Sequence, residues 1–317
     1  MKFDPVKDVP ELDGKVVIVT GSTSGIGFAT AQILVRKGAK VYLAARSEEK
    51  AKACLKRIED EGHEKGTAEW HHLDLADPAL AKASAEEFLK KEERLDILSA
   101  FSSLVMDEFK MGSRGIQEAL TTNHFSPFVF TSVLLPLLKS TATLPNSDVR
   151  IINVSSAGYI LVSPTQFKTK DDFNLSYEGE WFASMKRYGL SKLCNILWTK
   201  ELQRRLSDEG SNIICIVLHP GTVFTENVIS QVKGFPAILR PVAMPFCRAV
   251  MLNPTQGAGT QVIAATTPEA KKNPEKYKGA YLEPMGKIVK LSKTGGNAAL
   301  AQELWTTTEA LLKEMDL

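Results

Sequence analysis

Residues 15–28 read KVVIVTGSTSGIGF, a pattern that joins a strand, a glycine-rich turn and the start of a helix. The apolar run at 15–20 is rich in β-branched residues, which is typical of a buried strand. Glycines follow at Gly21, Gly25 and Gly27, and a helical pattern begins directly after them. Glycines let the backbone approach a pyrophosphate closely, and the N–H groups at a helix N-terminus favour its negative charge. The stretch therefore predicts a dinucleotide-binding turn.

Glycine spacing alone is weak evidence, because tight strand–helix turns also use glycine without any ligand. The spacing T-G-x-x-x-G-x-G also differs from the usual G-x-G-x-x-G. At residues 20–27 it resembles the cofactor loop of the short-chain dehydrogenases/reductases. The resemblance implies that the cofactor is bound by the residues of this loop, namely Gly21, Ser22, Ser24, Gly25, Ile26 and Gly27.

The composition narrows the function classes. The 39 basic and 37 acidic residues nearly cancel and form no long run of one sign, so no nucleic-acid surface is expected. Four cysteines without a C-x-x-C pair indicate reduced thiols in an intracellular protein, which we expect to be cytoplasmic. The N-terminus has no signal-peptide core, and no run of 18 apolar residues predicts a spanning helix. The histidines show no metal-ligand spacing, so no metal is expected.

Strand-like and helix-like segments alternate along the chain, which predicts a parallel sheet with helices on both faces. Strands are expected at 15–20, 40–45, 68–73, 95–101, 149–155, 212–218 and 280–283. Helices are expected at 47–61, 78–91, 113–138 and 187–206, the third interrupted near Pro127. We predict a single doubly wound α/β domain of the Rossmann type over residues 1–317, with about seven parallel strands as the family resemblance implies.

Arg46 follows the second expected strand, where NAD-binding units carry an acidic residue for the ribose 2′-hydroxyl. No acid occurs here until Glu48, and a guanidinium suits a 2′-phosphate. The alternative is a solvated arginine at a strand end. We favour NADP(H) over NAD(H) as the cofactor. The family resemblance places Asp74 and Leu75 beside the adenine ring.

The fourth expected strand departs from the family pattern. Short-chain dehydrogenases usually carry Asn-Asn-Ala-Gly after it, and the aligned residues here are Ala100, Phe101, Ser102 and Ser103. The asparagines of the motif normally support the sheet and the cofactor wall. The departure therefore puts the local geometry of the cofactor site in question.

Tyr188 and Lys192 form a Y-x-x-x-K pair on one face of an expected helix. An ammonium close to a phenol stabilises the phenolate and lowers its pKa from about 10. Such a pair exchanges a proton with an alcohol or carbonyl oxygen near neutral pH. An amphipathic helix presents this short motif by chance as well. With the residues that follow it, the motif resembles the retinol-dehydrogenase-like branch of the family.

Further segments resemble the family in the expected order. Ser156, after the fifth expected strand, aligns with the serine that hydrogen-bonds the substrate oxygen, and Ser155 is its competitor. Asn123 matches the asparagine that supports a proton-relay water, and its alternative role is a polar helix contact. The HPGTVFT segment resembles the nicotinamide-side loop, which implies cofactor contacts from Pro220, Gly221, Val223 and Thr225; otherwise it is an ordinary Pro-Gly turn.

Two segments are free to set substrate specificity. Residues 156–188 contain Tyr159, Phe167, Phe173, Trp181 and Phe182, and residues 226–253 contain Phe235, Ile238, Leu239, Pro241, Met244, Pro245 and Phe246. The prolines make the second segment a poor regular helix and favour a mobile lid. Its apolar content suits a pocket for a lipophilic ligand. Its alternatives are a subunit contact in a homodimer, packing on the core, or shallow contact with a membrane through Arg240 and Arg248.

These observations predict an NADP(H)-dependent oxidoreductase that interconverts a ketone or aldehyde and an alcohol on a lipophilic small molecule. Asn123, Ser156, Tyr188 and Lys192 are the expected catalytic residues. A redox-inactive nucleotide-binding regulatory protein and a non-redox enzyme for elimination or cyclisation remain alternatives, because fold does not determine function.

Overall fold

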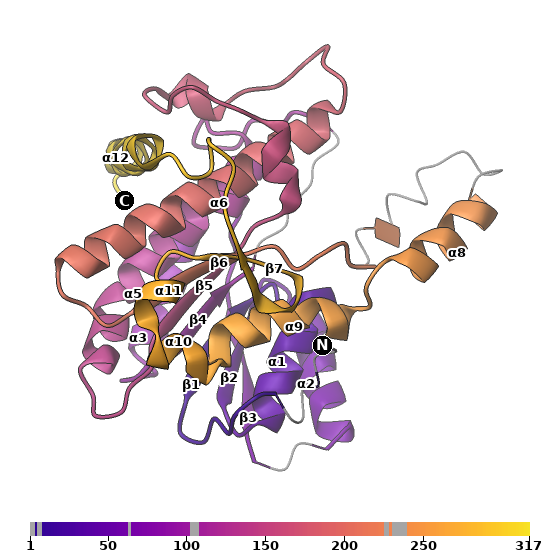
Figure 1. Cartoon of the computed structure of the whole chain (residues 1–317), viewed down its shortest axis with the longest axis vertical. Helices are drawn as coiled ribbons and strands as arrows, with labels where there is room; N and C mark the ends of the chain where they lie inside the picture. The colour runs from indigo at the N-terminus through magenta and orange to yellow at the C-terminus, as the bar shows by residue number, and fades with distance from the viewer. Residues whose placement is uncertain (1–3, 5–7, 63–64, 102–107, 225–227, 230–239) are drawn as a thin grey trace.

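The computed structural model describes residues 4, 8–62, 65–101, 108–224, 228–229 and 240–317. They form one α/β domain around an eight-stranded sheet with strand order β3-β2-β1-β4-β5-β6-β7-β8 (Figure 1). The strands are β1 Val16–Thr20, β2 Lys40–Ala45, β3 Thr67–His72, β4 Ile97–Ala100, β5 Arg150–Val154, β6 Ile214–Leu218, β7 Tyr281–Glu283 and β8 Lys287–Val289. The order reverses between β1 and β4, and ligands of such sheets bind outside the carboxyl ends of the strands at this point.

Two helical layers cover the sheet. One face packs against α3 Pro78–Leu89, α5 Ser126–Ala142, α6 Ala183–Asp208 and α12 Ala298–Glu314. The other packs against α1 Gly25–Arg36, α2 Glu48–Asp60 and α9 Pro254–Thr266, with the short helices α10 Pro268–Lys272 and α11 Pro274–Tyr277 following α9. Because both faces are covered, the central strands β1, β5 and β6 are buried along their whole length. The doubly wound α/β prediction is confirmed.

The sheet contains one more strand than expected. β1 to β7 are parallel, and β8 pairs with β7 in the antiparallel direction. Between them, Met285 and Gly286 both have positive φ, at 65° and 75°, which lets the chain reverse within a short turn. β8 has three residues and was too short for its periodicity to be detected.

The helix expected over 113–138 begins at Glu118 and ends at Ala142, and its predicted interruption near Pro127 is confirmed. The described chain there forms the short α4 Glu118–Leu120, a π-helical turn at Thr121–Phe125, and then α5. Pro127 lies in the first turn of α5 and has no N–H, so a regular α-helix cannot run through this point without losing a hydrogen bond. The continuous helical stretch 118–142 is also long and apolar enough to cross a membrane. The most apolar 18 residues of this stretch are 56% buried, and the stretch packs against α3, so we assign it to the core layer of the domain.

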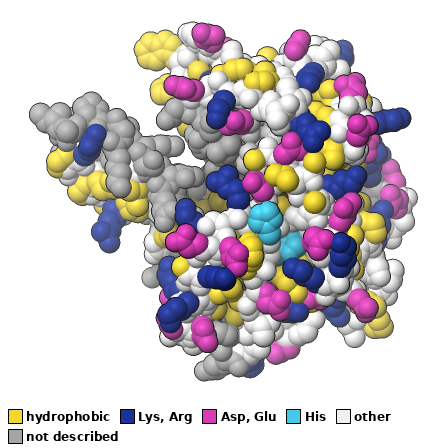
Figure 2. Space-filling model, turned by 180° about the vertical axis from the view of Figure 1, so that it is seen from behind, with side chains coloured by type: hydrophobic (Ala, Val, Ile, Leu, Met, Phe, Trp, Pro, Cys, Tyr) yellow, Lys and Arg dark blue, Asp and Glu magenta, His cyan; other side chains and the backbone are white. Residues whose placement is uncertain are grey.

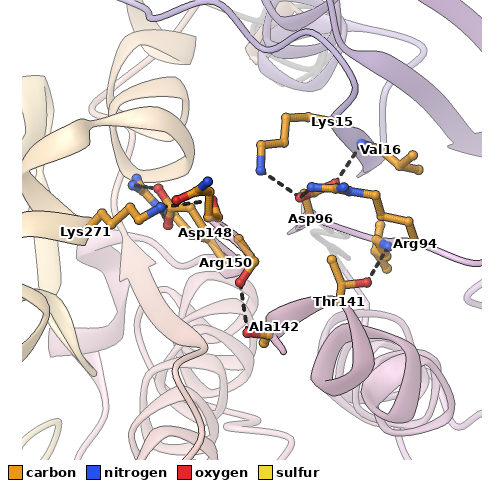
Figure 3. A network of polar contacts seen from close by, with 12 residues as sticks. Lys15, Val16, Arg94, Asp96, Thr141, Ala142, Asp148, Arg150 and Lys271 are labelled. Carbon is orange, nitrogen blue, oxygen red and sulfur yellow. Dashed lines mark hydrogen bonds and ion pairs between the residues drawn. The ribbon is translucent and has the colours of Figure 1, made fainter. Parts of the chain in front are cut away.

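Buried charges join the strands at the amino edge of the sheet, opposite the switch point (Figure 3). Asp96, just before β4, is fully buried and accepts hydrogen bonds from Lys15 Nζ at 2.9 Å and Arg94 Nε at 2.6 Å. Arg150, the first residue of β5, donates to both carboxylate oxygens of Asp148 at 2.9 and 2.7 Å. The bonds to Asp96 hold the amino ends of β1 and β4 together, whereas the Arg150–Asp148 pair lies within the segment that leads into β5. The opposite edge of the sheet is left for a ligand site.

Candidate active site

The glycine-rich turn is shaped by close backbone contacts. A Cβ atom at Gly27 would lie 2.3 Å from the carbonyl oxygen of Gly21, so only glycine fits there. Gly21 and Gly25 have φ of 61° and 53°, which glycine adopts without strain. Ser24, the N-cap of α1, makes no capping hydrogen bond with its side chain. The first N–H groups of α1 therefore face the carboxyl edge of the sheet, where an anion would satisfy them.

A cavity opens at this edge, beside the switch point between β1 and β4. Its wall comes from the β1–α1 turn, from the ends of β4, β5 and β6, and from α6. The lining residues are Ser24, Gly25, Ile26, Phe101, Val154, Ser155, Ser156, Tyr188, Lys192, His219, Pro220, Gly221 and Val223. Nine of the residues predicted from the sequence are therefore brought together: Ser24, Gly25, Ile26, Ser156, Tyr188, Lys192, Pro220, Gly221 and Val223.

The other predicted residues lie around this cavity rather than on its wall. Gly21, Ser22 and Gly27 form the turn itself, and the Ser22 side chain is fully buried. Arg46 is exposed directly after β2, and Asp74 and Leu75 are partly buried after β3. β2 and β3 lie on the β1 side of the switch point, so these three residues share the carboxyl edge with the cavity. Thr225 lies outside the described residues.

Tyr188 and Lys192 face the cavity from α6. Lys192 Nζ lies 5.4 Å from the centroid of the Tyr188 ring and donates to the carbonyl oxygen of Val154 at 3.1 Å. The Lys192 side chain is buried, with 1% of the residue exposed, and burial lowers its pKa to about 7. Burial disfavours the ammonium form of Lys192, whereas an anionic group bound in the cavity would favour it.

The two serines after β5 have different environments. The hydroxyl of Ser155 is buried and donates to the carbonyl oxygen of Lys192 at 2.8 Å, which joins β5 to α6. Ser156 is half-buried, and its hydroxyl accepts a hydrogen bond from the N–H of Gly158 at 3.2 Å. The hydroxyl hydrogen of Ser156 is not used in that bond. Of the two, Ser156 is therefore better placed to donate to a ligand.

Asn123 lies behind α6, in the π-helical turn. Its side chain is fully buried, and Nδ2 donates to Ser191 Oγ at 3.0 Å. Ser191 in turn donates to the carbonyl oxygen of Tyr188 at 2.7 Å. Asn123 is thereby connected to the helical turn that carries Tyr188.

Thr20 holds in place the start of the segment after β4, where the sequence departs from the family motif. Its hydroxyl donates to the carbonyl oxygen of Phe101 and accepts from the N–H of Phe101, both at 2.8 Å. This pair of bonds fixes the end of β4 against the end of β1. The Phe101 ring packs against Gly21: a Cβ atom on that glycine would lie 2.8 Å from ring atom Cδ1. Ser102 and Ser103 lie outside the described residues.

The sequence analysis assigned no site role to the lining residues Phe101, Val154 and His219, and it named Ser155 only as the competitor of Ser156. Their positions at the end of β4, β5 or β6, or directly after it, were the available signal, because strand ends at one edge of a parallel sheet converge. His219 directly follows β6, and burial lowers its pKa, an effect that the carboxylate of Glu283 opposes.

Comparison with known proteins agrees with this geometry. The family model for short chain dehydrogenase matches residues 15–164. A short-chain dehydrogenase/reductase of Armillaria gallica is 38% identical over 307 residues, which cover 96% of this chain and 95% of the relative. The chain belongs to the short-chain dehydrogenase/reductase family. The resemblance to the retinol-dehydrogenase-like branch stays a prediction.

Solved structures of this family share the fold of the chain. The Pseudomonas aeruginosa RhlG/NADP active-site complex is 26% identical with a TM-score of 0.64, covering 87% of this chain and 96% of that one. L-sorbose reductase from Gluconobacter frateurii, in complex with NADPH and L-sorbose, is 18% identical with a TM-score of 0.66, covering 90% and 100%. As a member of this family, the chain is an oxidoreductase.

Proposed function

We propose that this short-chain dehydrogenase/reductase uses NADP(H) to interconvert a ketone or aldehyde and an alcohol. The observation that carries the proposal is the convergence of Ser156, Tyr188 and Lys192 on one cavity, which the glycine turn also lines. The turn suits a dinucleotide because it is tight enough to place the first N–H groups of α1 beside a pyrophosphate. Its tightness requires glycine at position 27, where a Cβ atom would lie 2.3 Å from Gly21 O. When bound, the cofactor supplies or accepts a hydride.

The side chains of the cavity would handle the proton. In the reduction direction, Ser156 would donate a hydrogen bond to the carbonyl oxygen of the substrate, and the phenol of Tyr188 would give its proton to that oxygen. A protonated Lys192 would stabilise the phenolate left behind, since opposite charges favour one another within about 6 Å. Lys192 would also hold the nicotinamide ribose, and Asn123 would position the turn of α6 and support a relay of protons to Lys192. Alcohol oxidation reverses these transfers.

Cofactor contacts follow from the position of each residue at the carboxyl edge. The β1–α1 turn, with Gly21, Ser22, Ser24, Gly25, Ile26 and Gly27, would hold the pyrophosphate. Arg46 would bind the 2′-phosphate of NADP(H), and Asp74 and Leu75 would flank the adenine. Pro220, Gly221, Val223 and Thr225 would line the nicotinamide side. The NADP and NADPH complexes of the structural relatives support the choice of cofactor.

The aromatic side chains of residues 156–188, a segment free to set substrate specificity, divide into two groups. Tyr159, Phe167 and Phe173 belong to the hydrophobic core. Trp181 and Phe182 are exposed, at 85% and 72%. Exposed aromatic residues six or seven positions before Tyr188 support a lipophilic substrate, and an exposed apolar surface also suits a homodimer contact.

The cofactor assignment is tested by titrating NADPH and NADH into the wild type and Arg46→Asp. Loss of the guanidinium and gain of a repelling carboxylate should weaken NADPH binding at least about tenfold and leave NADH binding nearly unchanged. Arg36→Asp, at the far end of α1, is the matched control and should leave both affinities unchanged. Equal losses for both cofactors in Arg46→Asp would refute the role of Arg46.

Steady-state turnover separates the three function classes. NADPH consumption with a panel of lipophilic ketones and aldehydes is expected for the oxidoreductase. Tight NADPH binding without turnover of any member would indicate a regulatory protein. Conversion of a substrate without a change in NADPH would indicate elimination or cyclisation.

A further inference from the structure

The helix α8 Arg240–Val250 stands apart from the body of the domain. Figure 1 shows it extending beyond the sheet and its helical layers, and Figure 2 shows the same region as a separate projection bearing apolar and basic side chains. Phe246 is 64% exposed and Val250 62% exposed. The expectation of irregular chain is wrong for residues 240–250, because a helix forms despite Pro245. Large apolar side chains this exposed indicate an interaction surface.

The two faces of α8 differ in chemistry. Phe246, Ala249 and Val250 are all exposed, and their i, i+3, i+4 spacing places them on one face. Arg240 and Arg248 are two turns apart and lie on the opposite face. From residue 227 to 253 the sequence contains Lys233, Arg240 and Arg248 but no aspartate or glutamate. A basic face opposite an apolar face is typical of helices that lie in the interface of a bilayer.

Two chain segments that line the cavity are continuous with exposed apolar residues. Beyond α8, Leu252 pairs with the chain around the lining residue Val223: its N–H donates to Thr222 O at 2.9 Å, and its carbonyl accepts from Phe224 N–H at 2.8 Å. On the other side, the exposed residues Trp181 and Phe182 directly precede α6, the helix that carries Tyr188. Two exposed apolar segments, distant in sequence, are thus each joined to the wall of the same cavity.

We propose that α8 docks this protein on an anionic lipid surface, with Trp181 and Phe182 as a second contact. Arginines on the polar face complement anionic headgroups, while Phe246 and Val250 enter the acyl boundary. A second copy of the chain fits less well, because pairing α8 with itself would bring the like charges of Arg240 and Arg248 from both copies onto one contact. This lipid docking is independent of the proposed enzymatic function. Combined with the proposed function, it would deliver a lipophilic substrate to the mouth of the cavity.

Sedimentation with vesicles tests the proposal without cofactor or substrate. The full chain should bind vesicles of phosphatidylcholine and phosphatidylserine, bind pure phosphatidylcholine much more weakly, and lose affinity as salt rises. Phe246→Glu should weaken binding at least about tenfold, and Arg248→Gln about fivefold. Leu80→Glu, at a 47% exposed position on α3, is the matched control and should bind as the wild type does. Circular dichroism confirms that each variant is folded.

Tryptophan fluorescence tests the second contact. Vesicles should shift the emission of the wild type to shorter wavelength, and Trp181→Phe should remove most of that shift while leaving binding measurable. Equal binding to neutral and anionic vesicles, or no binding to either, would overturn the proposal. So would a dimer in analytical ultracentrifugation that Phe246→Glu dissociates, since a second copy would then cover α8.

Discussion

Lys192→Met should make the stability of the protein less dependent on pH. In the folded protein burial holds the pKa of Lys192 at about 7, against its ordinary value of 10.5. Between these two values the unfolded chain binds a proton that the folded protein does not. The unfolding free energy of the wild type therefore rises with pH across this window, and methionine at position 192 removes that contribution.

The size of the effect follows from one proton. Complete linkage contributes about 1.36 kcal/mol per pH unit, and near pH 7 the folded lysine is half protonated, so the change from pH 7 to pH 9 is about 2 kcal/mol. Without bound cofactor, the stability of Lys192→Met relative to the wild type should fall by this amount between the two pH values. Urea unfolding at pH 7, 8 and 9 measures the difference directly.

A control separates burial from the mere loss of a lysine. Lys200 lies on the same helix but is partly exposed, so Lys200→Met should follow the wild-type pH dependence. Parallel curves for the wild type and Lys192→Met would refute the reasoning, because they would mean that Lys192 titrates alike in the folded and unfolded chains. Turnover should be lost in Lys192→Met even where the variant is as stable as the wild type.

Two further substitutions test the turn and the amino edge of the sheet. Gly27→Ala should lower NADPH affinity at least about tenfold, because its Cβ would lie 2.3 Å from Gly21 O; unchanged affinity in calorimetry would contradict the model of the turn. Asp96→Asn should lower the unfolding free energy by about 2 kcal/mol at pH 7, because it removes the charge that pairs with Arg94 and Lys15. Burial would raise the pKa of Asp96, but the hydrogen bonds to those cations lower it. The difference from wild type in urea unfolding should therefore shrink as pH falls below the ordinary range of Asp, and a difference independent of pH would count against the ion pairs.

The parts of the fold that depend on local sequence were predictable. The signal for β1 and its glycine-rich turn lies within a few consecutive residues. Buried strands such as β6 are continuous apolar runs, which the sequence shows directly. β8 was not predictable because three residues carry no periodicity. The exposed helix α8 was missed because Pro245 disfavours a helix interior in general, although one lost hydrogen bond did not prevent the helix here.

The site was predictable where it is built from motif residues. It was not predictable where it depends on contacts between side chains that are distant in sequence. Tyr188 and Ser156 line one cavity as expected. The role of Thr20 in fixing Phe101 depends on the pairing of β1 with β4, which the sequence of either strand does not reveal. Phe173 shows the opposite limit: an aromatic residue in a long loop has the same sequence signal whether it lines a pocket or fills the core.

Transfer of deuterium is the most direct test of the proposed chemistry. The protein is incubated with NADPH doubly deuterated at C4 of the nicotinamide and with lipophilic ketones and aldehydes, and the alcohol product is analysed by mass spectrometry. We predict one deuterium on the carbinol carbon, with formation slowed at least about a hundredfold by Tyr188→Phe. Alcohol formed without the label, bound NADPH with no alcohol, or an unchanged rate in Tyr188→Phe would contradict hydride transfer with Tyr188 as the proton donor.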